Sequence, residues 1–115
     1  MKIINRYELA SMLDDNEVFT LINALPEEDF SQGHIPGSVN IPLSDDRSEF
    51  AREVEHHVES TDEKIVVYCA SSSCPVSRDA ADALDQAGFT NVFAYEGGMK
   101  DWQAAALPIE SGMHA

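Results

Sequence analysis

The sequence predicts an α/β fold in which a parallel sheet is covered by helices on both faces. Short blocks of apolar and β-branched residues alternate with segments of helical periodicity, which is typical of strands joined by crossover helices. The block at 65–68, IVVY, contains no charged residue, as expected of a strand buried on both faces. The chain has 115 residues, of which 43% are hydrophobic, so a single domain over 1–115 can bury a core without a metal or a disulfide.

The first half of the chain is expected to begin with a helix over 6–14. Asn5 can cap this helix, and Glu8 is placed to complete a capping box. An apolar run then predicts a buried strand, a proline starts a short helical turn, and the stretch GHIPGSVNIP leads into a short strand. These three elements are expected at 18–22, 26–30 and 39–41. His34 lies in that stretch, and we expect it to hydrogen-bond the backbone and hold the loop.

The second half begins with a predicted helix over 45–59, whose apolar residues recur every four positions. After the strand at 65–68, Pro75 fits the first turn of a helix that ends at Gly88. The apolar stripe of this helix is expected to consist of Val76, Ala80, Leu84 and Ala87. A strand at 92–95 and a last helix complete the alternating pattern.

The chain is strongly acidic, with 21 acidic and 7 basic residues and a net charge of −14. Such a charge repels nucleic acids and anionic lipid surfaces, so we expect no nucleic-acid partner and no membrane association. The first residues lack the pattern of a secretory signal, and no run approaches the ~20 apolar residues of a membrane helix. A cytoplasmic location is therefore expected.

Chemistry is expected at Cys69, which directly follows the strand at 65–68. Ligands of open α/β sheets bind beyond the carboxyl ends of the strands. The residues after Cys69 are small, so the chain can curl into a loop whose backbone N–H groups converge on the sulfur. These donors are expected to be the amides of Ala70, Ser71, Ser72, Ser73 and Cys74. The positive end of the helix that starts at Pro75 adds to them, which predicts a lowered thiol pKa and a reactive thiolate.

A metal site at the two cysteines is not expected. Cys69 and Cys74 have a C-x4-C spacing, no second ligand pair follows, and the next histidine is His114 near the end of the chain. The spacing therefore predicts no metal site at these cysteines.

Three stretches resemble the rhodanese-like domain family, and they occur in the family's order. The stretch IVVYC, with its small-residue loop and the helix SRDAADALDQAGF, is similar to the family's active-site segment. The stretch EEDFSQGHIPGSVNIP is similar to its first signature, and NVFAYEGGMKDWQAAALP to its closing one. The resemblance runs from about Asn5 to Pro108. It implies a five-stranded parallel sheet flanked by helices and, for active members, sulfurtransferase chemistry.

In active members of this family a loop cysteine takes a sulfane sulfur from a donor and passes it to an acceptor, and Cys69 matches that position. The resemblance implies a small donor, such as thiosulfate, polysulfide or a low-molecular-weight persulfide, and a thiol or cyanide as acceptor. It also implies that no metal or organic cofactor is needed. The backbone amides at 70–74 match the family's cradle for the outer sulfur.

The sequence departs from the family at the residues that bind an anionic donor. Many rhodaneses end the loop with an arginine, where this chain has Cys74 followed by proline. Arg78 comes a helical turn later and is the weaker candidate, which argues against thiosulfate as the donor. The Asp-Val-Arg triplet that often follows the second strand is replaced by Asn23, Ala24 and Leu25.

Several interpretations stay open beside a sulfurtransferase or persulfide carrier. A thiolate at Cys74 could resolve a Cys69 persulfide by forming a disulfide and releasing sulfide, or Cys74 could fill space under the loop. The two thiols could instead form a dithiol redox pair, or the domain could be a non-catalytic module that binds a protein partner through its acidic surface. A phosphatase or arsenate reductase loop is disfavoured, because it needs C-x5-R and Arg78 comes too late.

Overall fold

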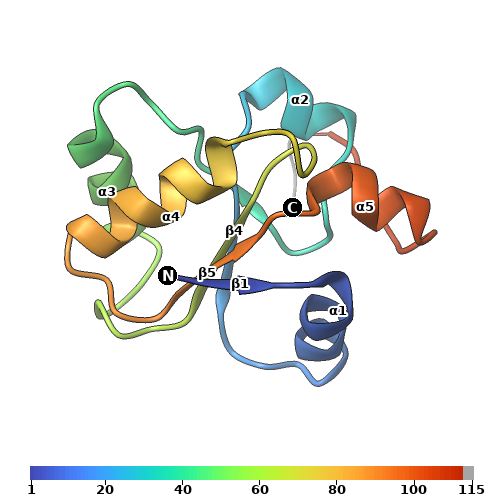
Figure 1. Cartoon of the computed structure of the whole chain (residues 1–115), viewed down its shortest axis with the longest axis horizontal. Coiled ribbons are helices and arrows are strands. Elements are labelled where there is room, and N and C mark those ends of the chain that lie inside the picture. The colour runs from blue at the N-terminus through green and yellow to red at the C-terminus, as the bar shows by residue number, and fades with distance from the viewer. Residues whose placement is uncertain (113–115) are drawn as a thin grey trace.

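The protein forms one five-stranded parallel sheet, as the family resemblance implies (Figure 1). The computed structural model describes residues 1–112, and residues 113–115, with His114 among them, lie outside the described part. The strand order is β1-β5-β4-β2-β3, and every pairing is parallel. The strands are β1 (Lys2–Ile4), β2 (Thr20–Asn23), β3 (Val39–Asn40), β4 (Ile65–Tyr68) and β5 (Val92–Tyr95).

Helices cover both faces of the sheet, which confirms the predicted α/β class (Figure 1). One face packs against α3 and α4, and the other against α1 and α5. The short helix α2 follows β2 at the carboxyl edge of the sheet. The helices are α1 (Arg6–Asp14), α2 (Glu27–Gln32), α3 (Arg47–Glu55), α4 (Val76–Gln86) and α5 (Gly98–Ala104).

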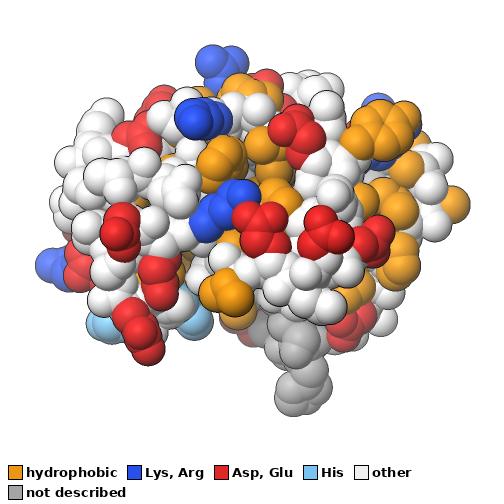
Figure 2. All heavy atoms as spheres, turned by 90° about the horizontal axis from the view of Figure 1, so that it is seen from below, with side chains coloured by type: hydrophobic (Ala, Val, Ile, Leu, Met, Phe, Trp, Pro, Cys, Tyr) orange, Lys and Arg blue, Asp and Glu red, His pale blue; other side chains and the backbone are white. Residues whose placement is uncertain are grey.

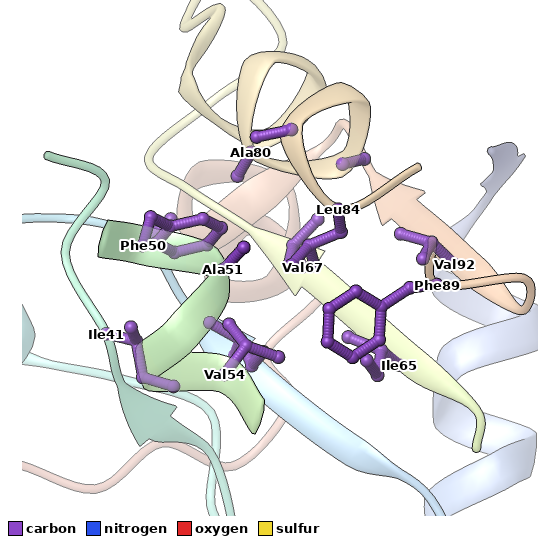
Figure 3. Packing of buried hydrophobic residues seen from close by; sticks show 14 of the residues in the cluster. Ile41, Phe50, Ala51, Val54, Ile65, Val67, Ala80, Leu84, Phe89 and Val92 are labelled. Carbon is purple, nitrogen blue, oxygen red and sulfur yellow. The ribbon is translucent and has the colours of Figure 1, made fainter. Parts of the chain in front are cut away.

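The central strand β4 contributes alternately to two hydrophobic clusters. Ile65 and Val67 pack with side chains of α3 and α4, as Figure 3 shows. Val66 and Tyr68 pack on the opposite face with side chains of α1 and α5. All four side chains are fully buried. Because helices cover both faces, a ligand can reach the sheet only at the ends of its strands.

Local sequence determines two helix ends as predicted. The Asn5 side chain accepts a hydrogen bond from the Glu8 N–H at 2.9 Å, and the Glu8 carboxylate accepts one from the Asn5 N–H at 3.1 Å. This capping box starts α1. Gly88 has a φ of +101°, a left-handed conformation that glycine adopts at low cost, and the chain leaves α4 there.

Three boundaries differ from the sequence prediction. Val18 is 92% exposed, and β2 begins only at Thr20, where pairing with β4 starts. The helix predicted over 45–59 is shorter, because the Asp46 side chain accepts the N–H groups of the first turn and so fixes its start. β1 was not predicted, since a three-residue edge strand shows no measurable periodicity.

The charge of the molecule is not concentrated in one cluster on the face shown in Figure 2, where acidic side chains are spread among hydrophobic and basic ones. Within residues 1–112, no helix has the length and apolar composition needed to cross a bilayer. In the same part of the chain, no group of three or more histidine, cysteine, aspartate or glutamate side chains is arranged to hold a metal ion.

Candidate active site

Cys69 lies at the carboxyl end of β4, where the sequence predicts the reactive centre. Its side chain is fully buried. The first turn of α5 holds the start of the loop, because the Met99 N–H donates to the Cys69 carbonyl oxygen at 2.9 Å and the Lys100 N–H donates to the Ala70 carbonyl oxygen at 2.8 Å. Gly98 permits this approach: it has a φ of +64°, and a Cβ there would lie 2.4 Å from the Cys69 carbonyl oxygen.

The loop after Cys69 curls over the sulfur but presents carbonyl oxygens to it. Cys69 Sγ donates to the Cys74 carbonyl oxygen at 3.5 Å, and the Ser71 carbonyl oxygen lies 4.0 Å away. The Cys74 N–H donates to the Ser71 carbonyl oxygen at 3.0 Å and thereby closes the loop. In this thiol form the Cys74 N–H is therefore bonded within the loop and not to the sulfur, and the cradle of loop amides for an outer sulfur stays a prediction.

The predicted lowering of the Cys69 pKa is also wrong in its direction. Burial raises the pKa of the Cys69 thiol, and the neighbouring Cys74 side chain raises it further. The N–H and hydroxyl of Ser77, in the first turn of α4, lower this pKa but do not outweigh burial. The groups at the start of α4 thus lower the Cys69 pKa, as the sequence analysis expected. The complete burial of the thiol, which raises this pKa, could not be deduced from sequence spacing.

Ser77 is the functional candidate that sequence reasoning missed. It is fully buried, and its hydroxyl has no hydrogen-bond partner among residues 1–112. A buried hydroxyl without a partner costs about 1–3 kcal/mol of stability. The buried stripe of α4 contains Ser77, Ala80, Ala81 and Leu84, so it shares Ala80 and Leu84 with the predicted stripe but begins at Ser77 and not at Val76. A polar residue at the first position of an i, i+3, i+4, i+7 pattern was the signal that could have found it.

The exposed serines of the loop border a shallow depression of about 280 Å³. Its lining residues are Ser71, Ser72, Ser73, Gly97, Lys100, Asp101 and Ala104. Lys100 brings to the loop a positive charge that the sequence analysis did not identify. Within residues 1–112 its ammonium group forms no ion pair, whereas the Asp101 carboxylate binds Arg6 at 2.9 Å and the Tyr95 hydroxyl at 2.5 Å.

Arg78, the other basic residue considered for this site, is directed elsewhere. Its Nε lies 3.2 Å from a carboxylate oxygen of Glu96, and its side chain is 63% exposed. Arg78 is not among the residues that line the depression. The structure therefore brings Lys100 to the loop and leaves Arg78 in a surface ion pair.

A satisfied polar network lies behind the site, at the hydroxyl of Tyr68. This buried hydroxyl accepts hydrogen bonds from the Ile35 N–H at 3.0 Å and from Asn23 Nδ2 at 3.1 Å. It also contacts Ser38 Oγ at 2.9 Å, and Ser38 donates to the Ile35 carbonyl oxygen at 2.7 Å. Burial raises the pKa of Tyr68, so its hydroxyl stays protonated. The network fastens the GHIPGSVN stretch to the end of β4.

His34 belongs to the same structural region. Its Nδ1 lies 2.9 Å from the Phe30 carbonyl oxygen, and its ring stacks on the Phe30 ring at 3.8 Å between centroids. His34 also exchanges backbone hydrogen bonds with Glu110. The residue hydrogen-bonds the backbone, as predicted, and holds the loop rather than facing Cys69.

Fold and site together place the protein among α/β proteins with a cysteine at the carboxyl end of the central strand. Residues 5–105 match the profile of the Rhodanese-like domain. The chain belongs to the rhodanese-like domain family, which confirms the resemblance seen in the sequence.

Three comparisons illustrate this membership. The chain is 34% identical over 109 residues to the HTH-type transcriptional regulator Rv0324 of Mycobacterium tuberculosis, with 95% of this chain and 45% of that protein covered. It thus spans less than half of that relative. It is 32% identical over 91 residues to thiosulfate sulfurtransferase 16, chloroplastic, of Arabidopsis thaliana, with 73% of each chain covered. The solution structure of the rhodanese-like domain from the Anabaena sp. Alr3790 protein has the same fold, with a TM-score of 0.79, 24% identity, and 98% of this chain and 81% of that chain covered.

Proposed function

We propose that this protein is a sulfurtransferase that carries sulfane sulfur as a persulfide on Cys69. The observation that carries the proposal is the position of this thiol, which ends the central strand and faces the first turn of α4 beneath a short loop. A thiolate formed there has an N–H and a hydroxyl donor available from Ser77. Family membership supports the same chemistry, since relatives include a thiosulfate sulfurtransferase.

The proposed cycle has two displacement steps. In the first, the Cys69 thiolate attacks the sulfane sulfur of the donor; a sulfur–sulfur bond forms at Cys69, the donor's sulfur–sulfur bond breaks, and its electron pair leaves with sulfite or a thiolate. In the second, a thiolate or cyanide attacks the outer sulfur, and the electron pair of the broken bond returns to Cys69. The cycle consumes no oxidant or reductant, so it needs only a donor and an acceptor.

The depression beside the loop supports a donor with an anionic group. Lys100 supplies a positive charge there, and the serine hydroxyls are hydrogen-bond donors. Thiosulfate, polysulfide and persulfides of charged thiols all carry such a group. Because Cys69 is fully buried, the donor reaches the sulfur only when the loop at 70–75 moves aside. Lys100 therefore takes the place of the loop arginine whose absence argued against thiosulfate.

Intact-mass spectrometry tests this function. Wild type, Cys69→Ser and Cys74→Ser are treated separately with thiosulfate, polysulfide and glutathione persulfide, and then with cyanide or a thiol. We expect wild type to gain one sulfur atom and to lose it to the acceptor, Cys74→Ser to gain it as well, and Cys69→Ser to gain none. If neither wild type nor Cys74→Ser gains sulfur from any donor, and wild type loses no hydrogens, the protein is a non-catalytic module and the proposal fails.

A second candidate, a dithiol cycle, is favoured by the position of Cys74. This half-buried thiol is free, and its side chain acts directly on the Cys69 thiol. Its thiolate would attack the inner sulfur of a Cys69 persulfide, forming a Cys69–Cys74 disulfide and expelling hydrosulfide; two low-molecular-weight thiols would then reduce the disulfide. In the same mass experiment, a loss of two hydrogens that requires both cysteines would identify this cycle.

A further inference from the structure

Ser77 is the second residue of α4 and is fully buried beneath the active-site loop. Serine hydroxyls in helices commonly donate to the carbonyl oxygen four residues earlier, which here belongs to Ser73. That bond is not made, and the Ser77 hydroxyl has no other partner among the described residues. The Ser77 hydroxyl is thus a buried donor without an acceptor, and it can gain an acceptor only if the protonation or chemical state of a neighbouring group changes.

Ser77 lies three residues after Cys74, whose carbonyl oxygen accepts the Cys69 thiol at 3.5 Å, so the first turn of α4 begins beside the sulfur. Burial raises the pKa of the Cys69 thiol, and the Ser77 N–H and hydroxyl are the groups that oppose this effect. The Ser77 N–H belongs to the first helical turn, where N–H groups have no partner within the helix. Ser77 therefore offers two donors to an ionised sulfur at Cys69.

The thiol proton of Cys69 is used within the loop, because Cys69 Sγ donates to the Cys74 carbonyl oxygen at 3.5 Å. Loss of that proton turns the sulfur from a donor into an acceptor and makes its contact with the carbonyl oxygen unfavourable. The Ser77 hydroxyl can then form a charge-assisted hydrogen bond to the sulfur.

We propose that Ser77 stabilises the anionic sulfur of Cys69: its hydroxyl stays without a partner while Cys69 is a thiol, and it donates to the sulfur once that atom is ionised or carries sulfane sulfur. The part that concerns sulfane sulfur rests on the proposed function. The part that concerns the thiolate does not require sulfur transfer. Removing the hydroxyl should therefore weaken the thiolate without weakening the folded thiol form.

Other titratable and charged groups surround the loop and are left unchanged by a substitution at Ser77. They are Cys74 in the loop, Arg78 and its partner Glu96, Tyr95 of β5, and Lys100 and Asp101 of α5. Replacing Cys74 by serine removes the second thiol. Tyrosinate absorbs in the same region as thiolate, so the absorbance difference between this variant and one that also carries Cys69→Ser reports Cys69 alone.

The test is an ultraviolet titration of the thiolate in Cys74→Ser, with and without Ser77→Ala, combined with thermal unfolding at neutral pH. We expect Ser77→Ala to raise the Cys69 pKa by about one unit, which lowers the rate of thiol alkylation at neutral pH about tenfold. Its melting temperature should stay the same or rise, by up to roughly 4 °C, because a buried polar group without a partner is lost. Ser77→Thr keeps the hydroxyl and should restore the pKa.

Ser38→Ala is the matched control, since Ser38 is equally buried but its hydroxyl has two partners. It should lower the melting temperature and leave the Cys69 pKa unchanged. The proposal is overturned if Ser77→Ala leaves the Cys69 pKa unchanged, if it lowers the melting temperature as Ser38→Ala does, or if both variants shift the pKa equally. A protein that takes up no sulfur would end the proposed function, while a raised pKa in Ser77→Ala would still establish the thiolate contact.

Discussion

Tyr68 and Ser77 place two buried hydroxyl groups on either side of Cys69, and the two groups differ in whether they have hydrogen-bond partners. The Tyr68 hydroxyl has three partners, which are Asn23 at the end of β2 and two residues of the following stretch, Ile35 and Ser38. The Ser77 hydroxyl has none among the described residues. Polar groups whose partners are supplied by the fold serve the fold, whereas a group left without a partner is available to a ligand or to a changed charge state. Stability and chemistry should therefore respond separately to changes on the two sides.

The largest effect is expected from Tyr68→Phe. Removing this hydroxyl leaves the Ile35 N–H and the Asn23 amide without an acceptor in the interior, so the free energy of unfolding should fall by about 2–4 kcal/mol. Urea denaturation measures this loss, and Ser77→Ala serves as the comparison. Sulfur uptake per folded molecule should stay at the wild-type level; a variant of wild-type stability that takes up no sulfur would contradict the division between the two sides.

A smaller effect is expected from Lys100→Ala, which extends the comparison to the outer rim of the loop. Loss of this charge should lower the second-order rate of persulfide formation with thiosulfate about fivefold at low salt, with no change in stability. The difference should vanish near ~1 M salt, where charges are screened within a few ångströms. Lys2→Ala, on the distant strand β1, is the control and should keep the wild-type rate. An equal decrease in rate in both variants would mean that the net charge of the protein, and not the position of Lys100, affects persulfide formation.

The smallest effect concerns pH. Burial raises the pKa of the Cys69 thiol above its ordinary value of 9.0, so the folded protein keeps a proton that the unfolded chain loses at the same pH. This contributes stability below the ordinary pKa that is lost as pH rises through the folded pKa. Between about pH 8 and 10, the free energy of unfolding of wild type should fall more than that of Cys69→Ser, by about 1 kcal/mol or less. Tyr68 and Tyr95, whose pKa values are also raised by burial, are present in both proteins. Parallel stability curves would rule out this contribution of Cys69.

The position of Cys69 could be predicted because it depends on short-range sequence. IVVY marks a strand buried on both faces, the carboxyl end of such a strand is where ligands bind, and Pro75 marks the next helix. The position of the candidate site therefore followed from about ten consecutive residues.

The surroundings of Cys69 could not be predicted, because they depend on burial and on segments far along the chain. Lys100 reaches the loop only because β5 pairs with β4 and brings α5 to the same edge. The sign of the Cys69 pKa shift depends on how completely the loop covers the sulfur. Ser77 was missed because the buried stripe of α4, although it shares Ala80 and Leu84 with the predicted stripe, begins at this polar residue and not at Val76.

The hydrogen bonds from Met99 and Lys100 to the loop carbonyl oxygens also have a consequence for biosynthesis. During synthesis Cys69 leaves the ribosome before α5 does. The nascent thiol is therefore present before the first turn of α5, which anchors the loop, has formed. β1 likewise can pair only after β5, its neighbour in the sheet, has been synthesised. Chains stalled between these points should present an uncovered cysteine to oxidants and alkylating agents, and completion of α5 should protect it.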